Sequence, residues 1–309
     1  MKVLFVCSGN PEFGISPIVR NQGESLRNNG VELDYFTIKG KGFKGYLKNV
    51  LMLKSFLKSN KYDIIHAHYS LSAIVASLAG AKPLIVSLMG SDIQARLFWR
   101  LIIKLLSKTH WKAIIVKSER MRKQIGISDA LVIPNGVDFE KFKPIKKNIA
   151  KRKIKFNEKK HIIFVSNPER YEKNFQLSKT AYNLFDIKNA ELNIVHDVDH
   201  DLMPYYYSGA DVLVVTSLWE GSPNVIKEAM ACNCPIVSTD VGDVKEVIGN
   251  TEGCYITSLD PKDVAEKIKM VLAFGKMTNG RERIIKLGLD SDEIAKKIID
   301  VYKEVLYKQ

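Results

Sequence analysis

The chain has 309 residues, of which 46% are hydrophobic and 26% are charged, and this composition is typical of a folded globular protein rather than a disordered or fibrous one. Its four cysteines exclude a scaffold held together by disulfides, and no apolar run approaches the roughly 20 residues of a membrane span. The apolar run at the start is too short for a signal peptide, so we expect a reduced, cytoplasmic protein.

The surplus of basic residues lies in the first half of the chain. Residues 1–150 contain 24 Lys and Arg and 10 Asp and Glu, which is a net charge of +14, whereas residues 151–309 have a net charge of −1. This asymmetry indicates an anionic partner for the first half, either membrane phospholipid or nucleic acid.

Short runs rich in Val, Ile and Leu alternate with helical patterns along the whole chain. In the first half they are KVLFVCSG, VELDYFTI, YDIIHAHYS, PLIVSLMGSD, AIIVKSE and LVIPNGV, and in the second half HIIFVSN, ELNIVHDV, DVLVVTSL, PIVSTDVG and CYITSL. Such runs are typical of parallel strands that are buried on both faces. The pattern predicts an α/β protein with two Rossmann-like domains, residues 1–145 and 146–290, which face each other across a cleft.

Two further segments complete this organisation. Residues 141–160 form a basic stretch with little apolar pattern, which predicts a linker between the domains. Residues 291–309 are predicted to form a helix that Ser291 could cap and that carries Ile294, Ile298 and Val301 near one face. We expect this helix to pack back on the first domain.

The segment from Asp211 to Gly242 carries the clearest sign of a binding site. A buried strand runs into the turn LWEGSP, where Ser222 is a plausible N-cap and Pro223 a plausible first helical residue. Open α/β sheets bind ligands where a strand ends and a helix begins. Glu220 and Glu228 bracket this point, and a carboxylate among apolar residues needs partners such as the paired hydroxyls of a sugar. In the alternative interpretation, Glu228 is a solvated helix residue and Glu220 a turn residue.

Two other loops could contribute to such a site. FVSNPERYEKNFQL places Arg170 and Lys173 between a strand and a helix, where they could grip a diphosphate and stabilise charge on a leaving group. Alternatively, they are two surface cations. In the loop SGNPEFGIS, Gly9 and Gly14 leave room for a ligand near the backbone.

Taken together, these segments resemble the retaining glycosyltransferases of family 4, of the bacterial polysaccharide or lipid-linked glycan type, which have the GT-B fold. EGSPNVIKEAM matches the E-x7-E motif of that family, VIPNGVDFEKFKP its interdomain signature, and NPERYEKN its Arg/Lys diphosphate site. DIIHAHYS and SLMGSD match its N-domain strand ends. The resemblance covers nearly the whole chain.

The resemblance implies a hexosyltransferase whose donor, a nucleotide-diphosphate sugar, binds mainly in the second domain without a metal or other cofactor. By match to the motifs, Glu228 would hold the ribose hydroxyls, Glu220 the donor sugar, and Arg170 and Lys173 the diphosphate, while Gly14 would approach the phosphates. The backbone of four further residues would contact the sugar: Gly221, Ser222, Pro223 and Asn224. The acceptor would be a glycan or a polyprenyl- or lipid-linked molecule. In the usual proposal for this family, the leaving phosphate itself takes the proton of the acceptor.

His66, His68 and Asp92 are the catalytic candidates on the acceptor side. The two histidines end a predicted strand and Asp92 follows Gly90-Ser91, and both are positions from which side chains can project into a cleft. Each histidine could equally be a structural one. Relatives often carry a histidine where this chain has Met89, so the identity of a catalytic base stays open.

Two patterns that could suggest a metal are interpreted otherwise. Asp197-Val198-Asp199 follows a strand of the second domain and is predicted to be a charged loop. Cys232 and Cys234 lack a matching second pair and are expected to be buried thiols. We therefore expect no metal site.

Residues 39–62 combine lysines with apolar side chains in a helical pattern, and residues 99–112 form a second such segment. A basic amphipathic helix can lie in a membrane interface, which predicts peripheral binding to the inner face of the cell membrane. In the alternative, the apolar side of the helix packs on the sheet of the first domain.

Two other functions are alternatives to sugar transfer. A sugar-nucleotide epimerase can also have two facing Rossmann-like domains, but PNGVD and E-x7-E argue against it. A basic nucleic-acid-binding protein would need a recognisable binding module or stacking aromatic residues, and the sequence has neither, so we expect no nucleic-acid partner.

Overall fold

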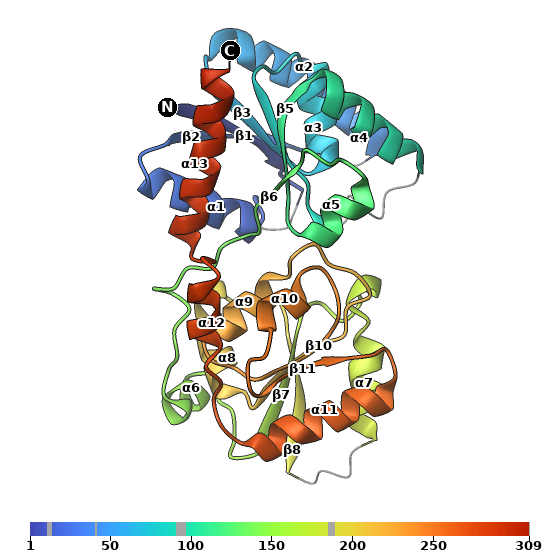
Figure 1. The fold of residues 1–309 in the computed structure, drawn as a ribbon, viewed down its shortest axis with the longest axis vertical. Coiled ribbons are helices and arrows are strands. Elements are labelled where there is room, and N and C mark those ends of the chain that lie inside the picture. Colours follow the sequence, from blue (N-terminus) through green and yellow to red (C-terminus); the bar gives the residue numbers. More distant parts are fainter. Residues whose placement is uncertain (11–13, 41, 91–96, 185–188, 309) are drawn as a thin grey trace. The chain divides into compact units, whose positions relative to one another are not determined.

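The computed structural model describes residues 1–10, 14–40, 42–90, 97–184 and 189–308, and the chain divides into two compact units (Figure 1). The first unit consists of residues 1–136 and 291–309, and the second of residues 137–290. The chain therefore passes into the second unit earlier than the predicted boundary at residue 145, and returns to the first unit for its last helix.

The first unit is built on a six-stranded sheet in the order β2-β1-β3-β4-β5-β6, and all neighbouring strands are parallel. The strands are β1 (Lys2–Ser8), β2 (Glu32–Ile38), β3 (Ile64–His68), β4 (Leu84–Ser87), β5 (Trp111–Val116) and β6 (Leu131–Val132). The helices are α1 (Pro17–Asn28), α2 (Gly42–Ser59), α3 (Ser70–Leu78), α4 (Leu97–Thr109), α5 (Glu119–Ile125) and α13 (Ser291–Tyr307).

Helices cover both faces of this sheet, as its apolar strands require. Strand β1 is buried along its middle, and its Val6 lies opposite Phe36 of β2 and Ala67 of β3. Helices α1 and α13 pack together over one face, and residues of α2, α3, α4 and α5 form the core over the other (Figure 1). The predicted last helix is confirmed, and its buried residues include Ile294 and Ile298.

The second unit has a five-stranded parallel sheet in the order β11-β10-β9-β7-β8. Its strands are β7 (Lys160–Val165), β8 (Ala190–Val195), β9 (Val212–Val215), β10 (Ile236–Thr239) and β11 (Cys254–Thr257). Its helices are α6 (Lys147–Lys153), α7 (Phe175–Asn183), α8 (Met203–Gly209), α9 (Asn224–Ala231), α10 (Val244–Ile248), α11 (Pro261–Phe274) and α12 (Gly280–Lys286), with 3-10 helices at Tyr171–Lys173 and His200–Leu202.

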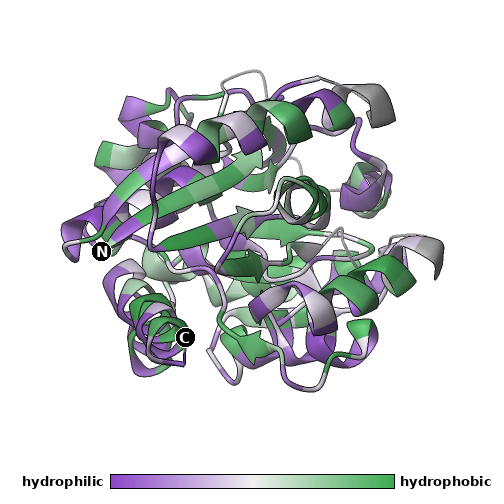
Figure 2. Ribbon diagram, turned by 90° about the horizontal axis from the view of Figure 1, so that it is seen from above, coloured by the Kyte–Doolittle hydropathy of each residue, from purple (hydrophilic) through white to green (hydrophobic). Residues whose placement is uncertain are grey.

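The helices of the second unit also fall on two faces. Residues of α7 and α11 form one core, and residues of α8, α9, α10 and α12 form the other. Part of the predicted linker is instead helix α6, which packs against α8 with Ala150 buried. The predicted linker is therefore wrong over this helix, because the few apolar residues of the basic stretch, among them Ala150 and Phe156, pack on the second unit. In Figure 2, hydrophobic strands lie between helices that carry much of the hydrophilic colour.

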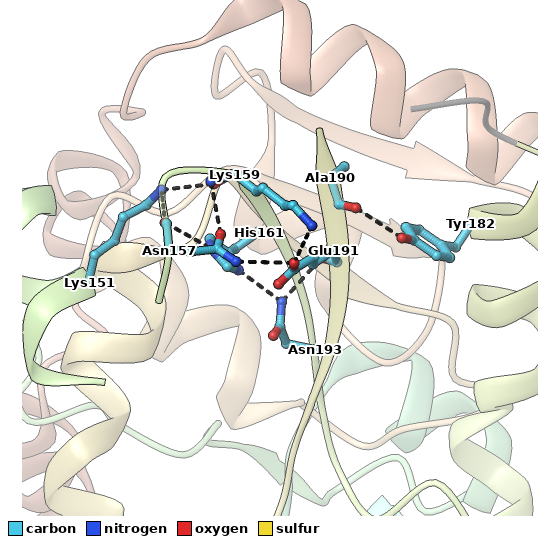
Figure 3. Close-up of polar contacts among 8 residues, drawn as sticks. All are labelled: Lys151, Asn157, Lys159, His161, Tyr182, Ala190, Glu191 and Asn193. Carbon is cyan, nitrogen blue, oxygen red and sulfur yellow. Dashed lines mark hydrogen bonds and ion pairs between the residues drawn. The ribbon is translucent and has the colours of Figure 1, made fainter. Parts of the chain in front are cut away.

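Polar side chains join the amino ends of β7 and β8 (Figure 3). Glu191 accepts hydrogen bonds from Lys159 Nζ at 2.8 Å and from Asn157 Nδ2 at 3.1 Å, and His161 Nε2 lies 3.1 Å from the carbonyl oxygen of Asn157. The ring of Phe156 stacks on His161 with centroids 3.9 Å apart. Burial lowers the pKa of His161, while its contact with Asn157 opposes that change. These groups bind one another at the edge opposite the strand carboxyl ends, so we assign them to stability.

Candidate active site

The strand order of the second sheet reverses between β7 and β9, which makes the carboxyl ends of these strands the candidate site. From β7 the chain moves outward to β8, and then returns past β7 to form β9 on the other side. In open α/β sheets, ligands bind at the carboxyl ends of the strands beside such a reversal. Here the loops that follow β7 and β9 cover residues 166–174 and 216–223, and they meet through a hydrogen bond from Leu218 N to Glu172 O of 2.8 Å.

Lys173 and Glu220 form an ion pair at this point, although 47 positions separate them in the sequence. Each side chain is 16% exposed, so the pair is shielded but reachable from solvent. Ser217 Oγ donates to the same carboxylate oxygen of Glu220 at 2.8 Å. The loop after β7 is held in place because Thr216 Oγ1 donates to Asn174 O at 3.0 Å. The structure thus brings together a cation and an anion that the sequence singled out separately.

Arg170 lies in the same loop but faces a different partner. Its guanidinium is 56% exposed and donates from Nε to Glu172 Oε1 at 2.7 Å. Burial of Glu172 opposes its ionisation, but hydrogen bonds from its own backbone N–H and from Arg170 lower the pKa of Glu172. Arg170 is therefore a partly solvated cation beside the site, and its interpretation as a surface cation stays open.

Glu228 is buried on α9, which overturns the interpretation of a solvated helix glutamate. Tyr207 of α8 donates its hydroxyl to Glu228 Oε2 at 2.8 Å, and His200 Nε2 lies 3.5 Å from Glu228 Oε1. Burial, together with the neighbouring Glu228, raises the pKa of Tyr207 well above its usual range. Phe142 packs edge-on against His200 with centroids 5.4 Å apart. Tyr207 thus supplies a hydrogen bond of the kind that a buried carboxylate requires, and His200 lies close to the other oxygen.

The turn before α9 is fixed by a polar group that the sequence did not reveal. Ser222 is not the N-cap, since α9 begins at Asn224 and Ser222 Oγ instead donates to Asp243 Oδ2 at 2.6 Å. Lys227 is 1% exposed, and its Nζ donates to Ser222 Oγ and lies 3.9 Å from Asp243 Oδ2. Burial lowers the pKa of Lys227 and raises that of Asp243.

A close backbone contact ties the same turn to the loop after β10. Gly242 has a φ of +59°, and a Cβ there would lie 2.7 Å from the carbonyl oxygen of Gly221. Only glycine therefore fits at this position without a shift of the backbone. The two loops at the carboxyl ends of β9 and β10 form one packed layer, which fixes the backbone from Gly221 to Asn224.

The candidates in the first unit differ sharply from one another. His66 is fully buried, with Nδ1 2.6 Å from Tyr302 Oη and Nε2 2.8 Å from Ser87 Oγ. Burial, with a smaller effect from Lys117, lowers the pKa of His66 to about 3. The expectation that His66 projects into a cleft is therefore corrected, because both ring nitrogens have partners inside the unit and the geometry favours a structural histidine.

His68 and Gly14 keep features of a site. The His68 ring is buried and stacks on His66 with centroids 4.4 Å apart, yet neither of its ring nitrogens has a hydrogen-bond partner among the described residues. His68 ends β3, next to β1 across the reversal of strand order in the first sheet. Gly14 has a φ of +81° and open space where a Cβ would lie. Asp92 lies outside the described residues.

The patterns interpreted against a metal have local partners. Asp197 Oδ2 lies 2.7 Å from His196 Nδ1, and Asp199 accepts a hydrogen bond from the backbone N–H of Asp201 at 2.9 Å. Cys232 and Cys234 are buried free thiols, as predicted, and burial raises the pKa of Cys232 to about 12. Among the described residues, no group of three or more His, Cys, Asp or Glu side chains is arranged to hold a metal ion.

Two family models match the chain, one in each half. The model described as glycosyltransferase family 4 matches residues 11–141, and the model described as glycosyl transferases group 1 matches residues 146–273. The chain is therefore a glycosyltransferase, and the two parallel sheets and the structural likenesses below give it the GT-B fold. Nothing in these matches favours an epimerase or a nucleic-acid-binding protein.

Among curated proteins, the putative teichuronic acid biosynthesis glycosyltransferase TuaC of Bacillus subtilis is 25% identical over 246 residues, which cover 70% of this chain and 63% of that protein. The UDP-Gal:alpha-D-GlcNAc-diphosphoundecaprenol alpha-1,3-galactosyltransferase of Escherichia coli is 26% identical over 264 residues, which cover 70% of this chain and 68% of that protein. This chain thus spans about two thirds of the length of either relative.

Solved structures show the same fold over the full chain. A sucrose-phosphate synthase from Thermosynechococcus elongatus has a TM-score of 0.86 at 19% identity, covering 100% of this chain and 99% of its own. HepE from Anabaena in complex with UDP-glucose has a TM-score of 0.75 at 16% identity, covering 98% of this chain and 100% of its own.

Four residues of the site were not predicted from the sequence: Tyr207, His200, Lys227 and Asp243. Tyr207 is one of three consecutive tyrosines, and nothing in the sequence distinguishes it from Tyr205 and Tyr206. His200 follows the segment that was predicted to be only a charged loop. A lysine on a helix is ordinarily expected at the surface, so the burial of Lys227 carried no signal.

Proposed function

We propose that this glycosyltransferase moves a sugar from a nucleotide-diphosphate donor to a glycan or lipid-linked acceptor, with retention of anomeric configuration and without a metal. The observation that carries the proposal is the meeting of Lys173 with Glu220 at the β7/β9 reversal. A cation there suits a diphosphate and an anion suits sugar hydroxyls, and both would lie within reach of one bound molecule.

The other site residues have roles that follow from their surroundings. Glu228 is held by Tyr207 and His200, and its oxygens would accept hydrogen bonds from the ribose hydroxyls of the donor. Arg170 would exchange Glu172 for the diphosphate, since its guanidinium is already at the surface. The locked turn from Gly221 to Asn224 would present its backbone to the sugar.

In the proposed reaction, the bond between the anomeric carbon and the diphosphate oxygen breaks, and the acceptor oxygen bonds to that carbon on the same face. The acceptor proton passes to the departing phosphate oxygen, so no protein base is required. Lys173 and Arg170 stabilise the negative charge that develops on the diphosphate. His68, whose buried ring nitrogens have no hydrogen-bond partner among the described residues, is the candidate for orienting the acceptor.

Two names support the class of donor and acceptor. HepE was solved in complex with UDP-glucose, and the Escherichia coli relative is named for a UDP-galactose donor and a diphosphoundecaprenol-linked acceptor. We carry over only the chemical classes, a nucleotide-diphosphate sugar and a glycan on a lipid carrier.

The test is a thermal-shift screen with UDP-, GDP- and ADP-sugars in the presence of EDTA. A true donor at 100 times its dissociation constant stabilises the protein by about 2.7 kcal/mol. Lys173→Met should weaken binding of that donor by roughly tenfold to a hundredfold, because a charge-assisted contact is lost, whereas Lys179→Met changes an exposed lysine of α7 and should bind normally. Equal donor binding by both variants would contradict the proposed diphosphate site.

Transfer itself is tested with the identified donor. Glu228→Ala should lose transfer by orders of magnitude while the fold survives, because a contact in a buried site is lost. The anomeric configuration of the product, read by NMR, should be that of the donor. An inverted product would overturn the retaining mechanism, and loss of transfer in EDTA would overturn metal independence.

A further inference from the structure

An apolar groove lies on the first unit between helices α2, α3 and α4. Its volume is about 250 Å³. The lining is formed by apolar side chains and one tyrosine, chiefly Tyr46, Leu47, Val50, Ile74, Leu78 and Trp99. The groove therefore offers hydrocarbon contacts and almost no hydrogen-bonding groups.

The groove opens to solvent through leucines that a folded protein would ordinarily bury. Leu47 is 50% exposed, Leu78 61% and the neighbouring Leu51 73%. The opposite side of α2 already fills the core of the unit, where Leu53 is fully buried. The exposed leucines are thus additional to the amphipathic packing of the helix, and clustered exposed apolar side chains mark an interaction site.

Lysines continue the same stripe along α2. Leu47, Leu51, Lys54 and Lys58 follow one another at intervals of four, three and four residues, so they share one side of the helix, and all four are exposed. Helix α4 repeats the combination, since its exposed residues include Leu101, Lys104, Leu105 and Lys108.

Acidic residues are absent from the sequence of all three helices. Helices α2, α3 and α4 together contain seven Lys and Arg and no Asp or Glu. A partner that combines negative charge with hydrocarbon matches this face, and an anionic phospholipid presents both in one molecule. An acidic protein surface would satisfy the lysines but leave the groove empty.

We propose that the face formed by α2, α3 and α4 docks on a membrane containing anionic phospholipid, and that one hydrocarbon chain of the lipid enters the groove. None of the described helices is long and apolar enough to cross a bilayer, so the contact is peripheral. The proposal does not depend on the transfer reaction, because neither the groove nor its rim contains a residue of the donor site.

Flotation with vesicles tests the docking. The protein should float with phosphatidylglycerol-containing vesicles and not with pure phosphatidylcholine, and added salt should weaken binding. Lys54→Gln with Lys58→Gln should weaken binding by about fivefold per lysine, and Leu47→Ser with Leu51→Ser by at least about tenfold. The matched controls, Lys153→Gln with Lys155→Gln and Leu184→Ser with Leu259→Ser, change exposed residues of the second unit and should bind as the unaltered protein does.

Tryptophan quenching tests the groove. Phosphatidylglycerol brominated on its acyl chain should quench the fluorescence of Trp99, read as the signal that Trp99→Phe removes. Donor binding by every variant should be unchanged, which separates failure of this proposal from failure of the proposed function. Equal flotation with neutral and anionic vesicles, or an unquenched Trp99, would overturn the proposal. So would a dimer in solution that Leu47→Ser with Leu51→Ser dissociates, because a second copy would then cover the face.

Discussion

Histidines in this chain show how far the surroundings of a single residue decide its chemistry. His66 is enclosed by Tyr302, Ser87 and the ring of His68, and burial keeps it neutral. His110, at the end of α4, is exposed to solvent. A buried imidazole with such a low pKa is a poor proton carrier at neutral pH, so the role of His66 is to connect β3 to α13.

The low pKa of His66 predicts a pH-dependent loss of stability. In the unfolded chain an imidazole titrates near pH 6.5, whereas in the folded chain His66 stays neutral down to about pH 3. Below about pH 6.5 the unfolded state therefore binds a proton that the folded state does not, and the unfolding free energy falls as the pH falls. His66 alone should contribute a loss of about 2 kcal/mol between about pH 7 and pH 5.

Urea denaturation across that pH range measures this loss, and the slope rather than the absolute stability is the readout. His66→Gln should flatten the slope, whereas His110→Gln, an exposed control in the same unit, should leave it unchanged. His68 adds to the loss, since burial and the neighbouring His66 lower its pKa as well. An unchanged slope in His66→Gln would show that His66 is protonated or solvated in the folded protein.

At the scale of elements, the loops after β9 and β10 act as one support for the proposed donor site. Lys227 is buried and Asp243 is half-buried on either side of Ser222, and each compensates the charge of the other. Removing one member of a buried pair is costly because the remaining charge loses its partner, whereas removing both costs less than the sum.

Lys227→Met should therefore lower the unfolding free energy by about 3 kcal/mol. The double variant Lys227→Met with Asp243→Asn should be less destabilised than the two single changes predict together. The same variants should weaken donor binding, because the turn from Gly221 to Asn224 loses its support. Lys245→Met, an exposed position on α10, is the matched control. Strict additivity of the two changes would mean that the charges do not interact.

The sequence predicts those elements whose apolar residues follow a regular pattern. Strands buried on both faces need continuous apolar runs, and the last helix needs its apolar residues on one side, so both were predictable. The meeting of Lys173 with Glu220 also followed from a general rule, because parallel strands end at one edge of the sheet.

Contacts that depend on how the helices pack did not follow from the sequence. The pairing of Tyr207 with Glu228 depends on how α8 packs on α9, and the burial of Lys227 depends on a carboxylate that follows β10. For His66, a strand buried on both faces gives no alternation that would tell an inward side chain from an accessible one. Each case was decided by packing between elements that are distant in the sequence.

For the whole molecule, the order of segments in the chain makes the first unit dependent on its last helix. The second unit is one continuous stretch of the chain. The first unit consists of two stretches, and the second of these is α13. Buried residues of α13 share a core with α1 and the sheet. Tyr302 of α13 also forms a hydrogen bond with His66 of the central strand β3. The first unit therefore cannot finish folding until the whole chain is present.

A chain that ends at Asp290 should accordingly keep its second unit folded and lose its first. Helix α13 buries Ile294, Ile298, Val301 and Val305, and at about 1.5–3 kcal/mol for each buried aliphatic side chain this contact amounts to roughly 6 kcal/mol or more. That is comparable to the entire stability of a typical domain, about 5–15 kcal/mol. Hydrogen exchange followed by mass spectrometry would then show fast exchange in peptides from residues 1–136 and protection in residues 137–290. A chain ending at Tyr307 is the control and should be protected throughout, and protection of both units in the shorter chain would show that the first sheet stands without α13.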